Sequence, residues 1–130
     1  MMTWSKAGSP RYHNILIVED EAPFRKILAR NLSKHGLRVL EADTVAAALR
    51  TIESENPDLL LLDIHLPDDT GWELLRVLQR RGVEIPTIVV TAVRVPEARR
   101  REFQPLAMLI KPFPLDALLH HILGEEVSNG

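Results

Sequence analysis

The sequence predicts an α/β fold, a doubly wound sheet of five parallel strands with helices on both faces. Five short apolar runs alternate with segments whose apolar residues recur at helical spacing, and short connections join them. Several of these runs are apolar at consecutive positions, which is typical of strands buried on both faces. The sequence contains no internal repeat, so the alternation indicates one sheet built from β-α units.

The predicted strands are short apolar runs rich in leucine and β-branched residues. Residues 59–62 are consecutive leucines, whereas Arg38–Ala42 alternates apolar and polar side chains, as expected of a strand nearer the sheet edge. In chain order, the predicted strands are Asn14–Val18, Arg38–Ala42, residues 59–62, residues 88–91 and Ala107–Ile110.

Proline, glycine and short polar residues bound the predicted helices. Pro23 fits a first helical turn, where its missing N–H costs nothing, and Asp43 or Thr44 can cap the second helix. Glycine is expected to end two of the helices. The helices are expected between Pro23 and Gly36, from Asp43 or Thr44 to Pro57, between Gly71 and Gly82, over residues 96–103 and over Leu115–Leu123.

Length and composition indicate one domain over residues 14–123, with a flexible leader (residues 1–13) and a tail (residues 124–130). The formal net charge of −2 implies no overall attraction to nucleic acid or to an anionic membrane. The absence of cysteine excludes disulfides, a thiolate metal site and a cysteine nucleophile. No apolar run approaches the ~20 residues of a membrane span, and the leader does not resemble a secretory signal, so a cytoplasmic location is expected.

Polar residues follow or close four of the predicted strands. Glu19 and Asp20 follow the first strand, Asp63 follows the leucine run, Thr91 ends the fourth strand and Lys111 follows the fifth. In folds of this class the site lies at the carboxyl ends of the strands. These five side chains are therefore expected to lie at one edge of the sheet.

Crowded carboxylates repel one another, and without a cation their pKa values rise. Oxygen ligands of this kind suit Mg²⁺, and no cysteine or histidine cluster favours a softer metal. Lys111 offers a mobile positive charge, Thr91 offers a hydroxyl, and Asp63 is a candidate nucleophile that can form an aspartyl phosphate. The simpler alternative is a structural ion cluster in which Lys111 only balances the acids.

Two of the motifs resemble parts of a known family. The run Ile-Leu-Ile-Val-Glu19-Asp20 resembles the acidic pair that follows its first strand. The run from the leucines through Asp63, with Pro67 four and Gly71 eight residues later, resembles its phosphoacceptor strand and loop.

Two further motifs complete the resemblance. Val-Val-Thr91-Ala92 resembles the family's hydroxyl residue and the small residue after it. Lys111-Pro112-Phe113 resembles its signature sequence, in which the Lys-Pro bond is usually cis. The sequence is thus similar to CheY-like receiver domains of response regulators over about residues 14–123. The resemblance implies the flavodoxin-like strand order 2-1-3-4-5.

The resemblance also implies a phosphorylation-activated switch of a two-component phosphorelay, which is not an enzyme in the usual sense. Asp63 would accept a phosphoryl group from a sensor histidine kinase or phosphotransfer protein, and Thr91 and Lys111 would bind the phosphoryl oxygens.

The implied Mg²⁺ ligands are Glu19, Asp20, Asp63 and the backbone carbonyl of His65. Glu19 stands where an aspartate is commoner, and it is expected to act through water. The side chain of His65 is expected to point at the mouth of the pocket.

Phosphorylation is expected to change one face of the domain, made by residues 96–103, Ala107–Ile110 and Leu115–Leu123. A downstream protein would bind there, and phosphorylation-dependent dimerisation is a further expectation. Direct contact with nucleic acid or a membrane is not expected. The three arginines at residues 99–101 are interpreted as a solvated helix face, with a docking patch as the alternative.

Two departures from the family concern the switch. Met108 stands three residues before Lys111, where the family usually has tyrosine or phenylalanine. Residues 93–107 form a short segment that carries Pro96 and Pro105 and lacks the usual Gly-Ala turn. Thr91 and Met108 are therefore the switch candidates, and Thr91 is expected to carry more of the coupling.

Three other functions compete with this interpretation. A degenerate receiver would act as a constitutive interaction module. A further alternative is that the chain is the amino-terminal part of a larger transcriptional regulator. A flavin carrier on the same fold would need a phosphate-binding loop after the first strand, where Glu-Asp-Glu at residues 19–21 would repel phosphate.

Overall fold

The computed structural model describes residues 11–124 and shows five parallel strands in the order β2-β1-β3-β4-β5. The strands are β1 (Asn14–Val18), β2 (Arg38–Ala42), β3 (Leu59–Asp63), β4 (Thr87–Thr91) and β5 (Ala107–Ile110). The predicted fold class and strand order are confirmed. Two ends differ from the prediction, because Asp63 belongs to β3 and β4 begins at Thr87.

The helices begin and end close to the predicted residues. Thr44, rather than Asp43, caps the second helix, and its Oγ1 accepts a hydrogen bond of 3.0 Å from the backbone N–H of Ala47. Pro96 immediately precedes the short helix that it was expected to begin. The helices are α2 (Ala22–Lys34), α3 (Val45–Glu55), α4 (Gly71–Arg80), α5 (Glu97–Phe103) and α6 (Leu115–Leu123).

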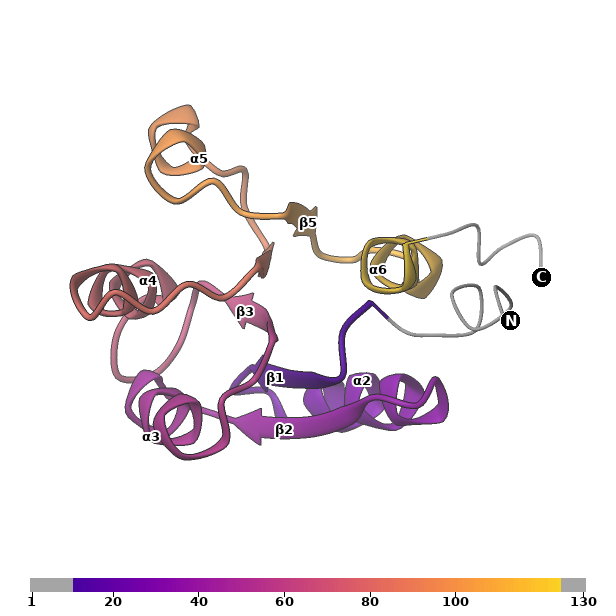
Figure 1. The fold of residues 1–130 in the computed structure, drawn as a ribbon. Coiled ribbons are helices and arrows are strands. Elements are labelled where there is room, and N and C mark those ends of the chain that lie inside the picture. The colour runs from indigo at the N-terminus through magenta and orange to yellow at the C-terminus, as the bar shows by residue number, and fades with distance from the viewer. Residues whose placement is uncertain (1–10, 125–130) are drawn as a thin grey trace, which may run out of the picture.

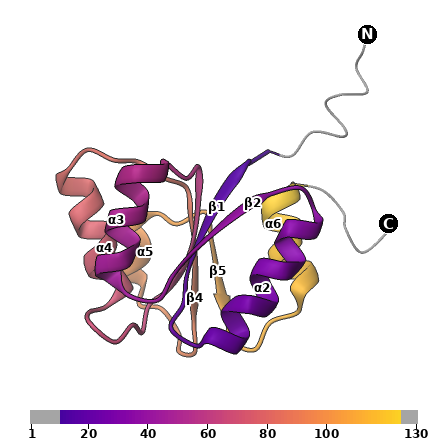
Figure 2. The ribbon, with the colours of Figure 1, turned by 90° about the horizontal axis from the view of Figure 1, so that it is seen from below.

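The helices cover the two faces of the sheet unequally. Figures 1 and 2 show α2 and α6 on one face and α3, α4 and α5 on the other. Leucine, isoleucine and valine of β1, β3 and β4 fill both layers, and the four leucines of β3 are at most 2% exposed. Burial on both faces explains why β3 reads as an unbroken apolar run.

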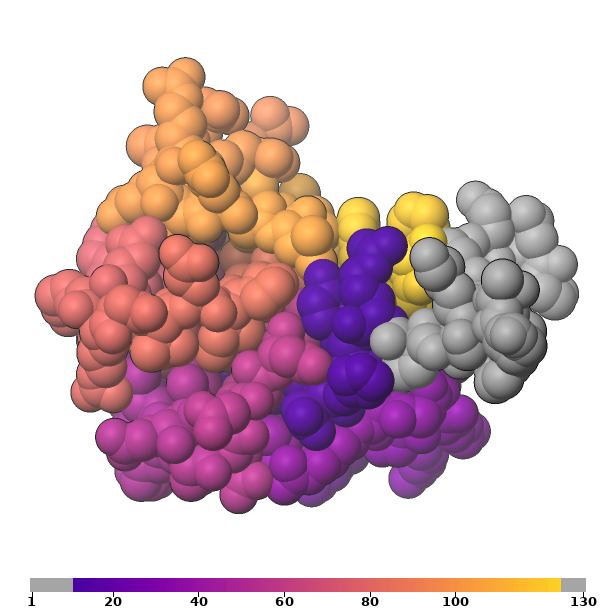
Figure 3. Space-filling model, viewed as in Figure 1, coloured from indigo at the N-terminus to yellow at the C-terminus, as the bar shows by residue number. Residues whose placement is uncertain are grey.

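Helix α5 is the least buried of the helices, because none of its residues is buried. It lies against α4 through Phe103, whose ring stacks on Trp72 with centroids 5.5 Å apart. The sequence analysis did not predict this stacking of Trp72 on α5. The atoms around α5, in orange, stand out from the rest of the molecule in Figure 3.

Most of the predicted leader and tail lies outside the described residues, and both stay predictions. Over residues 11–124, no helix is long and apolar enough to cross a membrane.

Candidate functional site

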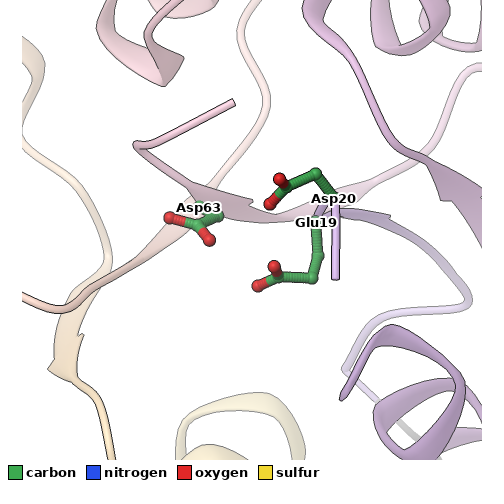
Figure 4. A group of neighbouring side chains, drawn as sticks. All are labelled: Glu19, Asp20 and Asp63. Atoms are coloured by element: carbon green, nitrogen blue, oxygen red, sulfur yellow. The ribbon is translucent and has the colours of Figure 1, made fainter. Parts of the chain in front are cut away.

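The carboxyl ends of β1 and β3 bring three carboxylates together. Glu19 and Asp63 are buried, at 2% and 5% exposure, whereas Asp20 is exposed. One carboxylate oxygen from each of the three residues lies within 4.8 Å of the others. Figure 4 shows Glu19 and Asp20 extending from the end of β1 toward the side of Asp63. The predicted convergence of the acids is therefore observed.

Lys111 lies among these acids. Its Nζ is 3.0 Å from Asp63 Oδ2, 2.9 Å from Glu19 Oε1 and 3.5 Å from Glu21 Oε1. The Lys111–Pro112 peptide bond is cis, as the resemblance implies. The sequence analysis did not assign a role to Glu21, although its place next to the acidic pair was a usable signal.

The cluster shifts the pKa values of two of its members. Burial raises the pKa of Glu19 from 4.5 to about 7, although hydrogen bonds from Lys111 and from the N–H of Glu21 oppose the rise. Burial alone would lower the pKa of Lys111, but hydrogen bonds to Glu19 and Asp63 outweigh it and raise that pKa above its ordinary value. The site thus holds a buried carboxylate that ionises reluctantly and a lysine that stays charged.

Phe24 packs beneath the lysine. Its ring centroid is 4.8 Å from Lys111 Nζ, within the range of a cation–π contact. Phe113 meets the Phe24 ring edge-on, with centroids 6.2 Å apart. The sequence analysis did not predict this contact, because helical spacing alone does not show which atoms a residue of the helix meets.

Arg25 fixes the backbone that carries Glu19. Its Nη1 donates a hydrogen bond of 2.7 Å to the carbonyl of Glu19, and its Nε lies 2.8 Å from Glu41 Oε1 on β2. The N–H of Glu19 in turn donates to the carbonyl of Ala42 at 3.0 Å. The turn after β1 is therefore tied to β2 on both sides of Glu19, an arrangement that the sequence did not predict.

The loop after β3 folds back onto Asp63. The N–H of His65 donates a hydrogen bond of 3.0 Å to Asp63 Oδ1, and the side chain of His65 is exposed. Gly71 begins α4 so close to β3 that a Cβ there would lie 2.7 Å from the carbonyl oxygen of Asp63. This close approach explains the glycine eight residues after the aspartate.

The same loop caps α3. Asp68 Oδ1 accepts a hydrogen bond of 2.9 Å from the N–H of Val45, and its Oδ2 accepts one of 3.0 Å from Ala46. The hydrogen bond from Val45 is the main cause that lowers the pKa of Asp68. The loop after β3 is thus joined to the first turn of another helix, a contact across 23 residues that the sequence analysis missed.

Thr91 connects the site to the segment that leads to α5. The residue is buried, and its Oγ1 accepts a hydrogen bond of 3.3 Å from the N–H of Val93. Its carbonyl accepts a bond of 2.8 Å from the N–H of Lys111. Thr91 pairs with Ile110 across β4 and β5.

Met108 lies on the face of β5 away from the α6 side. Together with Ile110 it lines a groove beside α5, whereas Leu109 packs into the core with α2 and α6. Met108 and Ile110 thus lie on one face of β5 and Leu109 on the other, as the alternation of a strand requires. Within α5, Arg99 pairs with Glu102 at 3.0 Å, so the expected solvated face is partly engaged in ion pairs.

Comparison with known proteins decides the family. Residues 15–123 match the family model of the response regulator receiver domain. The chain belongs to this family. As a receiver domain, it is part of two-component signalling, in which receiver domains interact with histidine kinases.

Curated relatives agree with this assignment. The chain is 43% identical over 79 residues to the KDP operon transcriptional regulatory protein KdpE of Escherichia coli (strain K12). This match covers 61% of the chain and 35% of the relative. It is 34% identical over 112 residues to the phosphate regulon transcriptional regulatory protein PhoB of Klebsiella pneumoniae, covering 83% of the chain and 49% of the relative. The chain therefore spans about half, or less, of the length of these relatives.

A solved structure agrees with the fold. The response regulator receiver domain protein (CheY-like) from Methanospirillum hungatei JF-1 is 31% identical and superposes with a TM-score of 0.78. The match covers 92% of this chain and 99% of that one.

Because the curated relatives named above are transcriptional regulatory proteins, the expectation that the chain makes no direct contact with nucleic acid is not confirmed. The cytoplasmic location and the phosphorylation-dependent dimer stay predictions.

The acidic cluster fits a divalent cation. Receiver domains generally bind Mg²⁺ at an acidic pocket, and the described residues contain a group of this kind in Glu19, Asp20 and Asp63. All of the donors are carboxylate oxygens, which a hard cation prefers. The buried position of Glu19, which disfavours its charge, is a physical reason for a cation there.

Proposed function

We propose that this receiver domain is a phosphorylation-activated signalling switch and that Asp63 accepts the phosphoryl group from a sensor histidine kinase or phosphotransfer protein. One observation carries the proposal. The Asp63 carboxylate lies at the end of a buried central strand, held by Lys111 at 3.0 Å and surrounded by Glu19 and Asp20. A carboxylate in this position can act as a nucleophile, and Lys111 beside it can balance the charge of the transferred phosphoryl group.

In the proposed step, a carboxylate oxygen of Asp63 attacks the phosphorus of a phosphohistidine. A P–O bond forms, the P–N bond breaks, and the imidazole leaves with the bonding electron pair. The His65 N–H, which donates a hydrogen bond to Asp63 Oδ1, orients the nucleophile. Lys111 turns from Asp63 Oδ2 toward a phosphoryl oxygen. The chain assists its own phosphorylation in this way and is not an enzyme in the usual sense.

Glu19, Asp20, Asp63 and the carbonyl of His65 are the residues that we propose hold Mg²⁺, with Glu19 acting through water. When bound, Mg²⁺ neutralises charge on the phosphoryl oxygens. The role of the acids is to hold the cation at the end of β3, within reach of Asp63.

We propose that Thr91 carries the signal out of the site. If its hydroxyl turns toward a phosphoryl oxygen, the hydrogen bond from Val93 N–H to Oγ1 is stretched. The backbone before α5 then shifts, and the face made by α5, β5 and α6 changes its affinity for a downstream protein. Met108, on the same face, has no aromatic ring to rotate.

A second candidate is that the chain is the amino-terminal part of a larger transcriptional regulator. It is favoured by the partial coverage of the curated relatives, 35% for KdpE and 49% for PhoB. A constitutive interaction module is less favoured, because Asp63, Lys111 and both neighbouring acids are in place.

A pull-down that compares the phosphorylated with the unmodified protein tests the switch. We expect a partner that is retained differently in the two states. In Lys111→Ala, the phosphoryl group should still be detectable but should no longer alter retention. Equal retention in both states of the wild type would reject a switch and favour a constitutive module.

A further inference from the structure

We propose that Asp68 is a positioning residue for the phosphorylation site. By joining the loop between β3 and α4 (residues 64–70, the β3–α4 loop) to α3, it holds the backbone of His65 in place beside Asp63. This inference rests on the proposed function, because the carbonyl of His65 belongs to the ligand set proposed there for Mg²⁺.

The β3–α4 loop is a narrow turn with His65 at its base and Asp68 in its tip. His65 pairs with Thr70 across the base in an antiparallel bridge, and the N–H of His65 donates to Asp63 Oδ1 at 3.0 Å. Pro67 immediately precedes Asp68, and its ring fixes its own φ angle, which stiffens the tip. A displacement of the tip is therefore passed on to the base, where His65 meets Asp63.

Asp68 joins the tip of the loop to α3. Its Oδ1 and Oδ2 accept hydrogen bonds of 2.9 and 3.0 Å from the N–H groups of Val45 and Ala46. Over residues 11–124, these are the hydrogen bonds that connect residues 66–69 to another helix or strand. Leu66 also packs against the apolar cluster beneath α3 and α4, but apolar contact is not directional. The direction of the tip is thus set by Asp68.

Helix α3 has a cap of its own and does not depend on Asp68 alone. The Oγ1 of Thr44 accepts from the N–H of Ala47 at 3.0 Å, as an N-cap residue does. The first turn of α3 contains no acidic residue, so the charge of Asp68 is the one that meets its N–H groups. The feature that distinguishes Asp68 from Thr44 is therefore the loop that it brings with it.

The same contact links the two halves of the acidic site. Helix α3 begins three residues after Ala42, whose carbonyl accepts the N–H of Glu19 at 3.0 Å. A continuous frame therefore runs from Glu19 through Ala42 and the start of α3 to Asp68, and from there to His65 and Asp63. This frame fixes the spacing between the acids that follow β1 and the acid that ends β3.

Asp68 acts on the site through this frame and not as a ligand. Among the described residues, the carboxylates that converge are Glu19, Asp20 and Asp63, and Asp68 is not in the group. Both of its oxygens already accept hydrogen bonds from α3. Any change in Mg²⁺ binding that follows from its removal must therefore come through the position of the loop.

The experiment compares the full chain with Asp68→Ala, Asp68→Asn and Thr44→Ala. The last is the matched control, because it removes a cap from the same helix but leaves the loop joined to α3. Urea unfolding measures how much stability each variant loses. NMR measures hydrogen exchange at the His65 amide without metal, and a titration with MgCl₂ followed by amide chemical shifts gives the Kd.

We expect the His65 amide to exchange several times faster in Asp68→Ala than in the wild type, because the loop opens more often. The Kd for Mg²⁺ should rise about threefold, less than the roughly 10- to 100-fold typical of a group bonded directly to a metal ligand. Asp68→Asn keeps one acceptor oxygen and should lie between the two. Thr44→Ala should keep the wild-type exchange rate and Kd despite its lower stability.

Two results would overturn the proposal. If Thr44→Ala changes the His65 exchange and the Kd as much as Asp68→Ala does, lost stability is the cause and Asp68 is only a cap. If neither quantity changes in Asp68→Ala, the loop does not need Asp68 to hold its position.

Phosphorylation by acetyl phosphate, followed by intact mass, separates this proposal from the proposed function. In Asp68→Ala, the Mg²⁺ concentration that gives the half-maximal rate should rise with the Kd, while the maximal rate changes less. If the wild type takes up no phosphoryl group but His65 exchange still depends on Asp68, the proposed function fails and the positioning role stands. If Asp68→Ala is phosphorylated with the wild-type Mg²⁺ requirement, the positioning role alone fails.

Discussion

Lys111 Nζ lies 4.8 Å from the centre of the Phe24 ring, directly beside the acids that it neutralises. The ring face attracts the ammonium and limits where it can move. Phe24 is therefore expected to be a positioning residue, which acts on Asp63 through Lys111.

Replacing Phe24 with leucine keeps an apolar side chain but removes the ring. A cation–π contact of about 0.5–1 kcal/mol predicts phosphorylation by acetyl phosphate that is about two- to fivefold slower. Phe24→Tyr should retain the wild-type rate. NMR should show ring-shifted Lys111 methylene signals in the wild type and tyrosine forms only. If Phe24→Leu is phosphorylated at the wild-type rate, Phe24 contributes only to core packing.

Asp68 should stabilise the fold in a pH-dependent way. Because hydrogen bonds lower its pKa in the folded state, its contribution is present above its ordinary value of 3.8 and is lost as the pH falls through the folded value. Asp68→Ala should cost about 1 kcal/mol in urea unfolding at neutral pH, the usual effect of losing a helix cap. Asp69→Ala, in the same loop, is the matched control. A deficit that persists unchanged in strong acid would show that the cap is not the cause.

Magnesium should stabilise the folded chain through the acidic cluster. A cation at ten times its Kd adds about 1.4 kcal/mol by mass action, so the melting temperature should rise with millimolar Mg²⁺. Asp20→Asn should remove most of this rise, whereas Asp69→Asn should keep it. A wild-type melting temperature that does not change with added Mg²⁺ would indicate a purely structural ion cluster.

Thr91 and Met108 should differ in their effect on the switch. Thr91→Ala removes the hydroxyl that bonds to Val93 N–H, so phosphorylation should change partner affinity much less. Met108→Ala should leave that change nearly intact, because methionine has soft torsions and makes a poor two-state element. Calorimetry with the partner retained in the pull-down measures the affinity of both variants before and after phosphorylation. If Met108→Ala abolishes the response while Asp63 is still phosphorylated, methionine is the switch.

The sequence predicted the fold and the meeting of the acids for the same reason. Strands buried on both faces must be parallel and covered by helices, and parallel strands place their carboxyl ends at one edge. Glu19, Asp63 and Lys111 each follow or end a parallel strand. Their convergence could therefore be predicted without knowing the directions of their side chains.

The supporting contacts could not be predicted in this way. Three contacts join segments whose relative placement depends on loop geometry and rotamers. They are the cap from Asp68 to α3, the hydrogen bond from Arg25 to the carbonyl of Glu19 and the stacking of Trp72 on Phe103. Hydrophobic period identifies the face on which such a residue lies, but it does not identify the atom that the residue meets.

The central claim is that Asp63 accepts the phosphoryl group. The most direct test is intact-mass and fragment analysis of the chain after incubation with acetyl phosphate, with and without Mg²⁺. We predict one added phosphoryl group, located on Asp63, dependent on Mg²⁺ and absent from Asp63→Asn. Undiminished labelling of Asp63→Asn, or a phosphoryl group located on another residue of the wild type, would contradict the account.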